Sequence, residues 1–170
     1  RNWKSKKRSL IESSDIMNDV VNRLISLEKT ISTMESCTGG SVVNAITNVE
    51  GASDVLKFSA VTYSNEYKIK MGVSEDIINE YSVYSIETAH EMSRVISNYT
   101  NSNYGIGITG KLNRVDKNNL VGEDNTIFIS IYDKDTDLYY DLELKAIYSD
   151  RESNKNYIVN EISKKLLTIL

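Results

Sequence analysis

The stretch Glu35-Ser36-Cys37-Thr38-Gly39-Gly40 lies between a short apolar run, 30–34, and an amphipathic run, 41–49. This pattern predicts a buried strand that ends in a glycine-containing turn and is followed at once by a helix. Such a turn leaves backbone N–H groups without acceptors, and the positive end of the helix adds to their field. The turn is therefore suited to hold an anion or a developing oxyanion, although an ordinary helix capped by Thr38 would explain the same residues.

Helices and strands are expected to alternate on both sides of this turn. In chain order, we expect a helix at about 15–27, a strand at 30–34, a helix at 41–49, a strand at 57–63, helices at 75–80 and 86–99 capped by Ser74 and Ser85, strands at 104–109, 126–132 and 138–148, and a helix at 153–169. The last two strands are joined by a short turn, so they form an antiparallel hairpin. The sequence therefore predicts an α/β fold, a three-layer α/β/α sandwich with a mixed sheet.

Two glycines interrupt the strand expected at 104–109. Gly105 and Gly107 lower the strand propensity of that segment. We therefore expect another part of the chain to pack closely against the backbone at this point.

The overall composition is that of one folded domain. The chain has 170 residues, of which 40% are hydrophobic and 26% charged, and we expect residues 1–170 to form one domain with a frayed basic arm at 1–12. A net charge of −4 argues against binding to nucleic acid or to an anionic membrane. No apolar run approaches the roughly 20 residues that a membrane span needs, and nothing resembles a secretory signal. The single cysteine suits a reducing compartment, so we expect a cytoplasmic protein.

The same composition restricts the chemistry. The chain has one histidine and one cysteine, whereas zinc sites usually need three or four such ligands, so we expect neither a metal nor a cofactor. His90 lies in the middle of an expected helix, where it is poorly placed for a Ser-His-Asp triad. A catalytic base is therefore to be sought among Lys, Glu, Asp and Tyr residues.

Three segments with chemically useful side chains, 35–40, 63–68 and 109–114, directly follow expected strands. Sites in open α/β sheets gather beyond the carboxyl ends of the strands, so these segments are candidates for a site. Ser36 is a candidate nucleophile, and Lys68 is its candidate base if a partly apolar pocket lowers the pKa of the lysine. Tyr63 is placed to relay a proton or to hydrogen-bond the pair. This set of residues indicates acyl transfer or amide hydrolysis without histidine.

Two residues of the first motif have more than one interpretation. Cys37 is a rival nucleophile, since a helix N-terminus lowers the pKa of a thiol, but free cysteines are usually buried and no histidine is placed to activate this one. Neighbours in an extended chain point in opposite directions, so we prefer Ser36 at the site and Cys37 in the wall behind it. Glu35 either orients Lys68 or caps the turn.

The motifs, taken together, resemble the C-terminal domain of the CinA (competence/damage-inducible) family. The resemblance covers about residues 15–169 and rests on Glu35-Ser36-Cys37-Thr38-Gly39-Gly40, Gly51-Ala52-Ser53, Val61-Thr62-Tyr63-Ser64-Asn65-Glu66 with Lys68, Gly72-Val73, Val83 with Ser85, Gly107-Ile108-Thr109-Gly110 and Asp150-Arg151. It implies a three-layer α/β/α sandwich, a homodimer, and a stand-alone form without the N-terminal domain of longer members.

The resemblance also implies an activity, the hydrolysis of nicotinamide mononucleotide to nicotinic acid mononucleotide and ammonia. Carried over by motif, the catalytic residues would be Ser36 as nucleophile, Lys68 as base and Tyr63 as their partner. The substrate would be bound by the Thr38–Gly40 turn (Thr38, Gly39 and Gly40), by Thr109 and Gly110, and by Arg151, which would meet its phosphate or its carboxamide.

One segment departs from the family pattern. Family members continue Thr-Gly into a loop rich in glycine and proline, whereas this chain reads Thr109-Gly110-Lys111-Leu112-Asn113-Arg114-Val115-Asp116, and Ser149 replaces the usual glycine before Asp150-Arg151. Lost glycines reshape a wall that a ligand approaches closely. Either the substrate is a different amide, or Lys111 and Arg114 replace the lost backbone donors, or the domain is a catalytically impaired module that binds a pyridine nucleotide or a protein partner.

Overall fold

The computed structural model describes residues 3–113 and 124–170, so Arg114, Val115 and Asp116 of the altered loop lie outside the described residues. Its elements are α1 (Trp3–Leu27), β1 (Ile31–Glu35), α2 (Ser41–Thr47), a 3-10 helix η1 (Ala52–Asp54), β2 (Ala60–Val61), α3 (Asn65–Lys70), α4 (Glu75–Tyr81), α5 (Ile86–Thr100), β3 (Tyr104–Gly110), β4 (Thr126–Asp133), β5 (Leu138–Lys145) and α6 (Arg151–Ile169).

The five strands form one mixed sheet in the order β2-β1-β3-β4-β5. β1 pairs in parallel with β2 and with β3, and the hairpin of β4 and β5 adds two antiparallel strands to the outer side of β3. The carboxyl ends of β1, β2 and β3 therefore share one edge of the sheet. α6 begins at that same edge, because β5 ends there.

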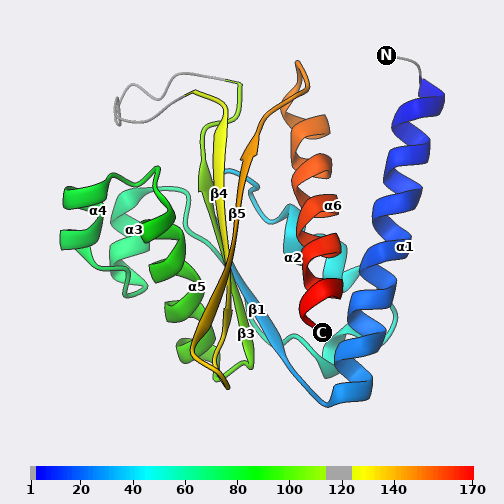
Figure 1. Cartoon of the computed structure of the whole chain (residues 1–170), viewed down its shortest axis with the longest axis horizontal. Coiled ribbons are helices and arrows are strands. Elements are labelled where there is room, and N and C mark those ends of the chain that lie inside the picture. The colour runs from blue at the N-terminus through cyan, green and yellow to red at the C-terminus, as the bar shows by residue number, and fades with distance from the viewer. Residues whose placement is uncertain (1–2, 114–123) are drawn as a thin grey trace.

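Helices cover both faces of the sheet, which confirms the three-layer α/β/α fold. In Figure 1, α3, α4 and α5 lie on one side, while α2, α6 and α1 lie on the other, with α1 outermost. A larger apolar core fills the space between the sheet and α1, α2 and α6, and a smaller one lies on the α5 side.

Several boundaries differ from the sequence prediction. The first helix begins at Trp3 and not near residue 15, so the expected frayed arm at 1–12 is wrong for residues 3–12, which lie in α1. The strand expected at 57–63 is only the two residues Ala60–Val61, and a short helix, α3, follows it. The predicted caps are confirmed: Ser74 and Ser85 each accept a backbone N–H of the first turn of α4 and α5.

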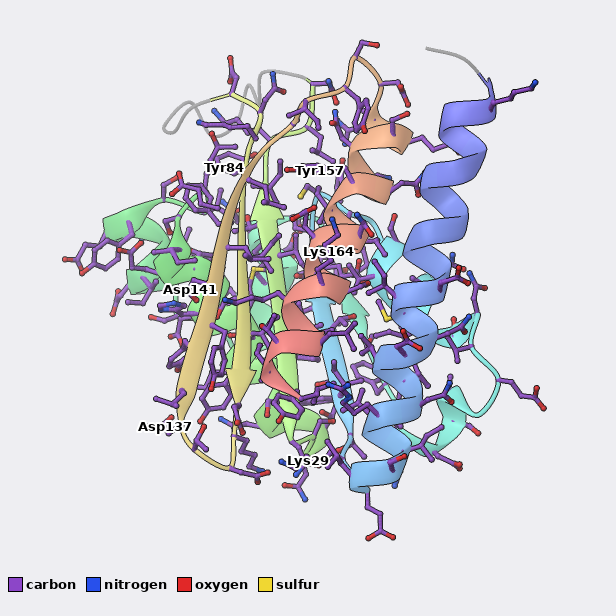
Figure 2. All side chains as sticks on the ribbon, turned by 45° about the vertical axis from the view of Figure 1, so that its right-hand side comes forward. Lys29, Tyr84, Asp137, Asp141, Tyr157 and Lys164 are labelled. Carbon is purple, nitrogen blue, oxygen red and sulfur yellow. The ribbon has the colours of Figure 1, made fainter. Side chains whose placement is uncertain are left out.

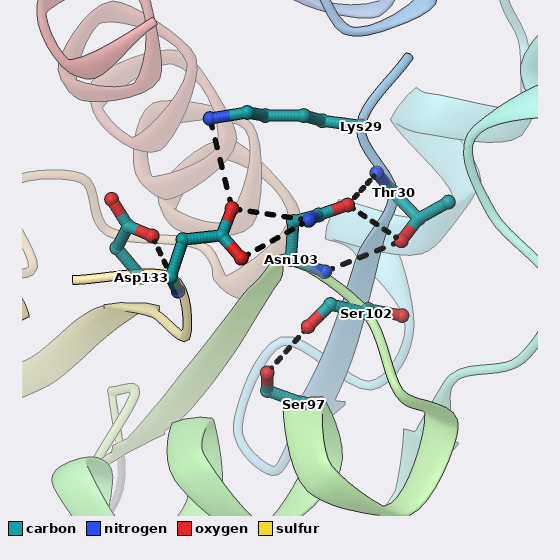
Figure 3. A network of polar contacts seen from close by, with 7 residues as sticks. Lys29, Thr30, Ser97, Ser102, Asn103 and Asp133 are labelled. Atoms are coloured by element: carbon teal, nitrogen blue, oxygen red, sulfur yellow. Dashed lines mark hydrogen bonds and ion pairs between the residues drawn. The ribbon is translucent and has the colours of Figure 1, made fainter. Parts of the chain in front are cut away.

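A polar network ties the sheet together at the end away from the shared carboxyl edge (Figure 3). The Asn103 side chain accepts the backbone N–H of Thr30 at 2.9 Å and donates to the Asp135 carboxylate at 3.1 Å, which Lys29 approaches at 3.8 Å. The start of β1, the start of β3 and the β4–β5 turn are thus joined by one side chain. These contacts hold the strands in register, and the opposite edge remains for the site.

The glycines of β3 are where α5 comes closest to the sheet. A Cβ placed on Gly107 would lie 2.7 Å from the backbone N of Ser93 and 2.8 Å from Cβ of Met92, and one on Gly105 would collide with the backbone oxygen of Ser93. The expected close approach at these glycines is confirmed. α5 can therefore lie directly on the backbone of β3.

We expect Gly107→Ala to lower the free energy of unfolding by about 2 kcal/mol or more, because overpacking a tight contact forces backbone shifts. Urea denaturation followed by circular dichroism measures the change, with the exposed Ser53→Ala as the control. A Gly107→Ala protein with the stability of the wild type would contradict the close packing of α5.

Candidate active site

The carboxylate of Glu35, at the end of β1, organises the turn that follows it. Glu35 is fully buried and accepts four hydrogen bonds: from the hydroxyls of Thr33 (3.0 Å) and Thr38 (2.8 Å), and from the backbone N–H groups of Val42 and Val43 (both 2.9 Å). The last two are orphan donors of the first turn of α2. Glu35 therefore caps α2 from the preceding strand, which decides between its two interpretations.

The alternative interpretation, an ordinary helix capped by Thr38, does not hold. The N-cap residue of α2 is Gly40, with φ of 100° and no side-chain cap bond, and Thr38 is buried and donates to Glu35. Gly39, with φ of 60°, is also in the left-handed region that glycine adopts without strain. The side chain of Thr38 thus supports the turn from inside, and only its backbone is placed to meet a ligand.

The candidate nucleophile Ser36 and the candidate base Lys68 are in direct contact beside this turn. The Lys68 ammonium donates to Oγ of Ser36 at 3.0 Å and to the carbonyl oxygen of Thr62 at 2.7 Å. The side chain of Lys68 is only 1% exposed, and Ser36 is 9% exposed. A fully buried lysine aimed at a serine hydroxyl is unusual, since lysine is almost never buried without a specific role.

The short helix α3, which was not among the helices expected from the sequence, aims Lys68 inward. Its N-cap, Ser64, accepts the backbone N–H of Tyr67. Lys68 is the buried residue of α3, whereas Lys70 points outward and pairs with Glu66 at 2.8 Å. Two lysines of one helical turn therefore have opposite environments, and one of them is a natural control for the other.

Cys37 lies in the wall behind the turn. It is 5% exposed and belongs to the larger apolar core. Burial raises the pKa of its thiol to about 12, although the positive charges of Lys68 and Arg151 act in the opposite direction. A thiol with this pKa stays protonated at neutral pH, so the geometry favours Ser36 over Cys37 as nucleophile.

Arg151, the first residue of α6, joins two of the loops at the carboxyl edge. Its guanidinium donates to the carbonyl oxygen of Leu112, in the loop after β3, and to Oη of Tyr63 at 3.2 Å. Tyr63 is 64% exposed, and its hydroxyl oxygen accepts a hydrogen bond from Arg151. Tyr63 and Arg151 thus lie together at the carboxyl edge of the sheet.

The end of β3 contributes less directly than predicted. The Thr109 side chain is fully buried and donates to the carbonyl oxygen of Val83 at 2.9 Å, so it fixes the segment before α5. Gly110 ends β3, and a Cβ there would lie 2.6 Å from the carbonyl oxygen of Thr126. Both residues shape the wall at this edge of the sheet through its packing.

Lys111 is not the exposed loop charge that one interpretation required. Lys111 is buried. Its ammonium nitrogen lies 3.6 Å from the Asp124 carboxylate and 4.9 Å from the centre of the Tyr84 ring. Tyr84 is labelled near this end of the sheet in Figure 2. A role for Lys111 as a freely available anion ligand is therefore not supported by this geometry.

Sequence reasoning missed Lys155, one helical turn after Arg151 on α6. Its ammonium nitrogen lies 3.4 Å from the position that a Cβ of Gly39 would occupy. The spacing of four residues from Arg151 was the available signal, since residues four apart share a helix face.

No metal or membrane feature accompanies this site. Among the described residues, no group of three or more His, Cys, Asp and Glu side chains is arranged to hold a metal ion. Within the same ranges, every helix is too short or too polar to cross a bilayer.

Fold and site together define the class of protein: an α/β/α domain with a buried serine–lysine pair at the carboxyl edge of its parallel strands. The sequence model of the CinA C-terminal domain matches residues 13–170, so the chain belongs to the CinA C-terminal domain family. This confirms the resemblance seen in the motifs.

Relatives and solved structures agree with this family. A CinA-like protein of Flavobacterium psychrophilum is 39% identical over 124 residues, which are 71% of this chain and 29% of the relative, and a putative competence-damage inducible protein of Clostridium beijerinckii is 44% identical over 100 residues, 58% of this chain and 24% of the relative. The chain thus spans less than a third of these relatives. A CinA superfamily protein of Escherichia coli has the same fold, with a TM-score of 0.83 at 23% identity over 93% of this chain and 90% of that one.

We expect Glu35→Ala to destabilise the domain by about 3 kcal/mol or more, because it leaves buried donors of α2 and of two threonines without their acceptor. Denaturant unfolding measures this, with the exposed Glu50→Ala as the matched control. Equal stability of the two variants would show that Glu35 does not cap α2.

The thiol of Cys37 should react very slowly in the folded protein. With a pKa of about 12, roughly one thiol in ten thousand is ionised at pH 8. The rate of alkylation by iodoacetamide should therefore keep rising with pH well above pH 9. In the unfolded chain, the pH dependence of this rate should have its midpoint at the ordinary thiol pKa of about 8.5. Because the chain has one cysteine, mass spectrometry reports this site alone. A native midpoint below pH 9 would contradict the buried, neutral thiol.

Proposed function

We propose that this domain hydrolyses the carboxamide of nicotinamide mononucleotide, releasing nicotinic acid mononucleotide and ammonia, with Ser36 as nucleophile and Lys68 as base. The observation that carries the proposal is the buried Lys68 ammonium 3.0 Å from Oγ of Ser36 in a chain of the CinA family. Amide hydrolysis needs a nucleophile and a group that first takes and then returns a proton. The pair supplies both functions without histidine.

The reaction begins when neutral Lys68 takes the hydroxyl proton of Ser36 while Oγ attacks the carboxamide carbon. The tetrahedral intermediate collapses, the C–N bond breaks, and the leaving nitrogen takes the proton from Lys68 and departs as ammonia. Water then attacks the acyl-serine with Lys68 as base, the bond between the acyl carbon and Oγ of Ser36 breaks, Oγ takes back the proton from Lys68, and the carboxylic acid product leaves. Burial supports this role, because a lysine removed from water is more easily neutral than an exposed one.

The turn after Ser36 supplies donors for the oxyanion. Gly39 N–H bonds to the carbonyl oxygen of Ser36 at 2.9 Å, and Ser41 N–H bonds to that of Thr38 at 3.1 Å. Within the described residues, the backbone N–H groups of Thr38 and Gly40 have no such acceptor. Preorganised backbone donors beside a nucleophile stabilise the negative charge that develops on the carbonyl oxygen.

The alternative is a catalytically impaired module that binds the nucleotide without turnover. The observation that favours it is the replacement of the glycine- and proline-rich loop by a segment in which Lys111 is buried against Asp124 and Tyr84. That change affects the wall of the site and leaves the serine–lysine pair in place. The two functions differ in one measurable quantity, ammonia release.

We expect the purified domain to release ammonia from nicotinamide mononucleotide, with activity that rises with pH as Lys68 becomes neutral. Ser36→Ala and Lys68→Met should each reduce kcat on the order of a thousandfold or more, because each removes a group that takes part in bond making. A coupled ammonia assay over roughly pH 6 to 10 measures both effects.

The controls lie close to the tested residues. Lys70→Met on the same helix and Ser53→Ala on the surface remove an exposed lysine and an exposed serine, and both should keep the wild-type rate and pH profile. If Lys68→Met retains the rise with pH, Lys68 is not the base. Binding of the nucleotide without ammonia release by the wild type would establish the impaired module instead.

A further inference from the structure

The side-chain hydroxyl of Thr62 is a buried polar group that the fold leaves unpaired. Thr62 directly follows β2 and is 2% exposed. Within residues 3–113 and 124–170, its Oγ1 atom has no hydrogen-bond partner. A buried hydroxyl without a partner costs free energy, and native proteins keep few of them. We therefore asked which group near Thr62 could bond this hydroxyl in another state of the protein.

Thr62 lies directly beside Ser36 in the sheet. β1 and β2 run parallel with Glu35 opposite Val61, and the backbone N–H of Thr62 donates to the carbonyl oxygen of Glu35 at 2.8 Å. This bond extends the pairing by one residue beyond the two strands. Thr62 is thus the neighbour of Ser36 across a strand spacing of about 4.8 Å.

The side chains of Thr62 and Ser36 also lie on the same face of the sheet. Met34 and Ala60, two residues earlier on the paired strands, both pack in the smaller apolar core on the α5 side. Side chains alternate along a strand, so Ser36 and Thr62 face that side as well. α3, which carries Lys68, lies on this side of the sheet (Figure 1).

Thr62 already holds Lys68 through its backbone. The lysine nitrogen donates to the carbonyl oxygen of Thr62 at 2.7 Å and to Oγ of Ser36 at 3.0 Å. Four covalent bonds separate that carbonyl oxygen from Oγ1 of the same threonine, so the two oxygens lie within about 5 Å of each other. Because the lysine stem is flexible and its donors rotate, Nζ can exchange Ser36 for the Thr62 hydroxyl while it stays buried.

Such an exchange is needed halfway through the proposed reaction. Once ammonia has left, Lys68 is a neutral amine with two N–H donors and one lone pair, and Oγ of Ser36 is part of an ester. An ester oxygen is a weaker acceptor than a hydroxyl oxygen. Lys68 is only 1% exposed, so water cannot replace the lost acceptor without cost.

We propose that Thr62 is a positioning residue for the second half of the reaction, in which its hydroxyl accepts an N–H of Lys68 once Ser36 is acylated. This inference rests on the proposed function, since it takes an acyl-serine as the intermediate. With one N–H on the carbonyl oxygen of Thr62 and the other on Oγ1, the lone pair of Nζ is directed away from both, toward the attacking water. The water proton passes to Nζ, and it passes on to Oγ of Ser36 when the bond between Oγ and the acyl carbon breaks.

The variant Thr62→Val removes the hydroxyl and keeps the shape of the side chain. Because the hydroxyl is unpaired in the resting protein, the midpoint of denaturant unfolding should be equal to or higher than that of the wild type. A lower midpoint would show that the resting fold already uses this hydroxyl, and the proposal would be wrong. This measurement does not depend on activity.

The kinetic test compares nicotinamide mononucleotide with the methyl ester of nicotinic acid mononucleotide. Both form the same acyl-serine, but the ester has the better leaving group, so water attack limits its turnover. We expect Thr62→Val to lower kcat for the ester on the order of tenfold, the effect of one hydrogen bond, with KM falling in proportion. The ratio kcat/KM should be unchanged for both substrates, because it reports acylation. Intact mass spectrometry should show the acyl-enzyme accumulating.

Two further variants complete the test. Thr62→Ser keeps a hydroxyl and should restore kcat for the ester. Thr47→Val removes an exposed threonine hydroxyl at the end of α2 and should have no effect. A fall in kcat/KM without a fall in ester kcat, or a Thr62→Ser protein as slow as Thr62→Val, overturns the role in water attack.

The outcomes separate this inference from the proposed function. If both substrates are hydrolysed and Thr62→Val matches the wild type, the activity stands and the role of Thr62 is wrong. If only the ester is hydrolysed, at a rate that depends on the Thr62 hydroxyl, the role of Thr62 stands and amide hydrolysis is wrong. If neither substrate acylates Ser36, both are wrong.

Discussion

The buried carboxylate of Glu35 is the interaction on which the site depends. A carboxylate at the end of a strand accepts two backbone N–H groups from the first turn of the next helix, and so fixes the direction in which α2 leaves the sheet. The same carboxylate accepts the hydroxyl of Thr38 at 2.8 Å, and Gly39 N–H bonds to the carbonyl oxygen of Ser36 at 2.9 Å, so the turn is held from both sides. The hydroxyl of Ser36 and the free donors of the turn are consequently presented by a rigid frame, which is what preorganised catalysis requires.

The second constraint is the burial of Lys68, and it comes from a different part of the chain. α3 is only six residues long, yet it turns Lys68 under the sheet edge and leaves Lys70 in solvent. Burying an ammonium costs free energy that its bonds to Ser36 and Thr62 offset only in part. Buried ionisable groups of this kind cluster at functional sites, so the contact between Lys68 and Ser36 supports the proposed function.

The loop after β3 departs from the expected family sequence, whereas the contact between Ser36 and Lys68 beside it is in place. Lys111 sits where the family has glycine-rich sequence, and its charge is balanced inside the protein by Asp124 and the Tyr84 ring. The positive charge of Lys111 is therefore already paired within the fold. The anion-binding role that one interpretation gave to this lysine is therefore not supported by its contacts.

The sequence by itself determined the class of fold and singled out Ser36 and Lys68 as a candidate pair. Periodicity predicted most of the strands and helices, and the glycines of β3 predicted a close approach to its backbone. The motifs placed Ser36 and Lys68 after strand ends, because local pattern is enough for that, but their contact was decided by the tertiary structure. The sequence did not predict α3, the helical start of the chain or the cap of α2. Only the tertiary structure decided that Glu35 caps α2, that Tyr63 bonds Arg151, that Lys111 is buried and that Lys155 faces Gly39. Each of these is a contact between side chains brought together by the sheet order and the placement of α6, and no spacing along the chain specifies such a contact.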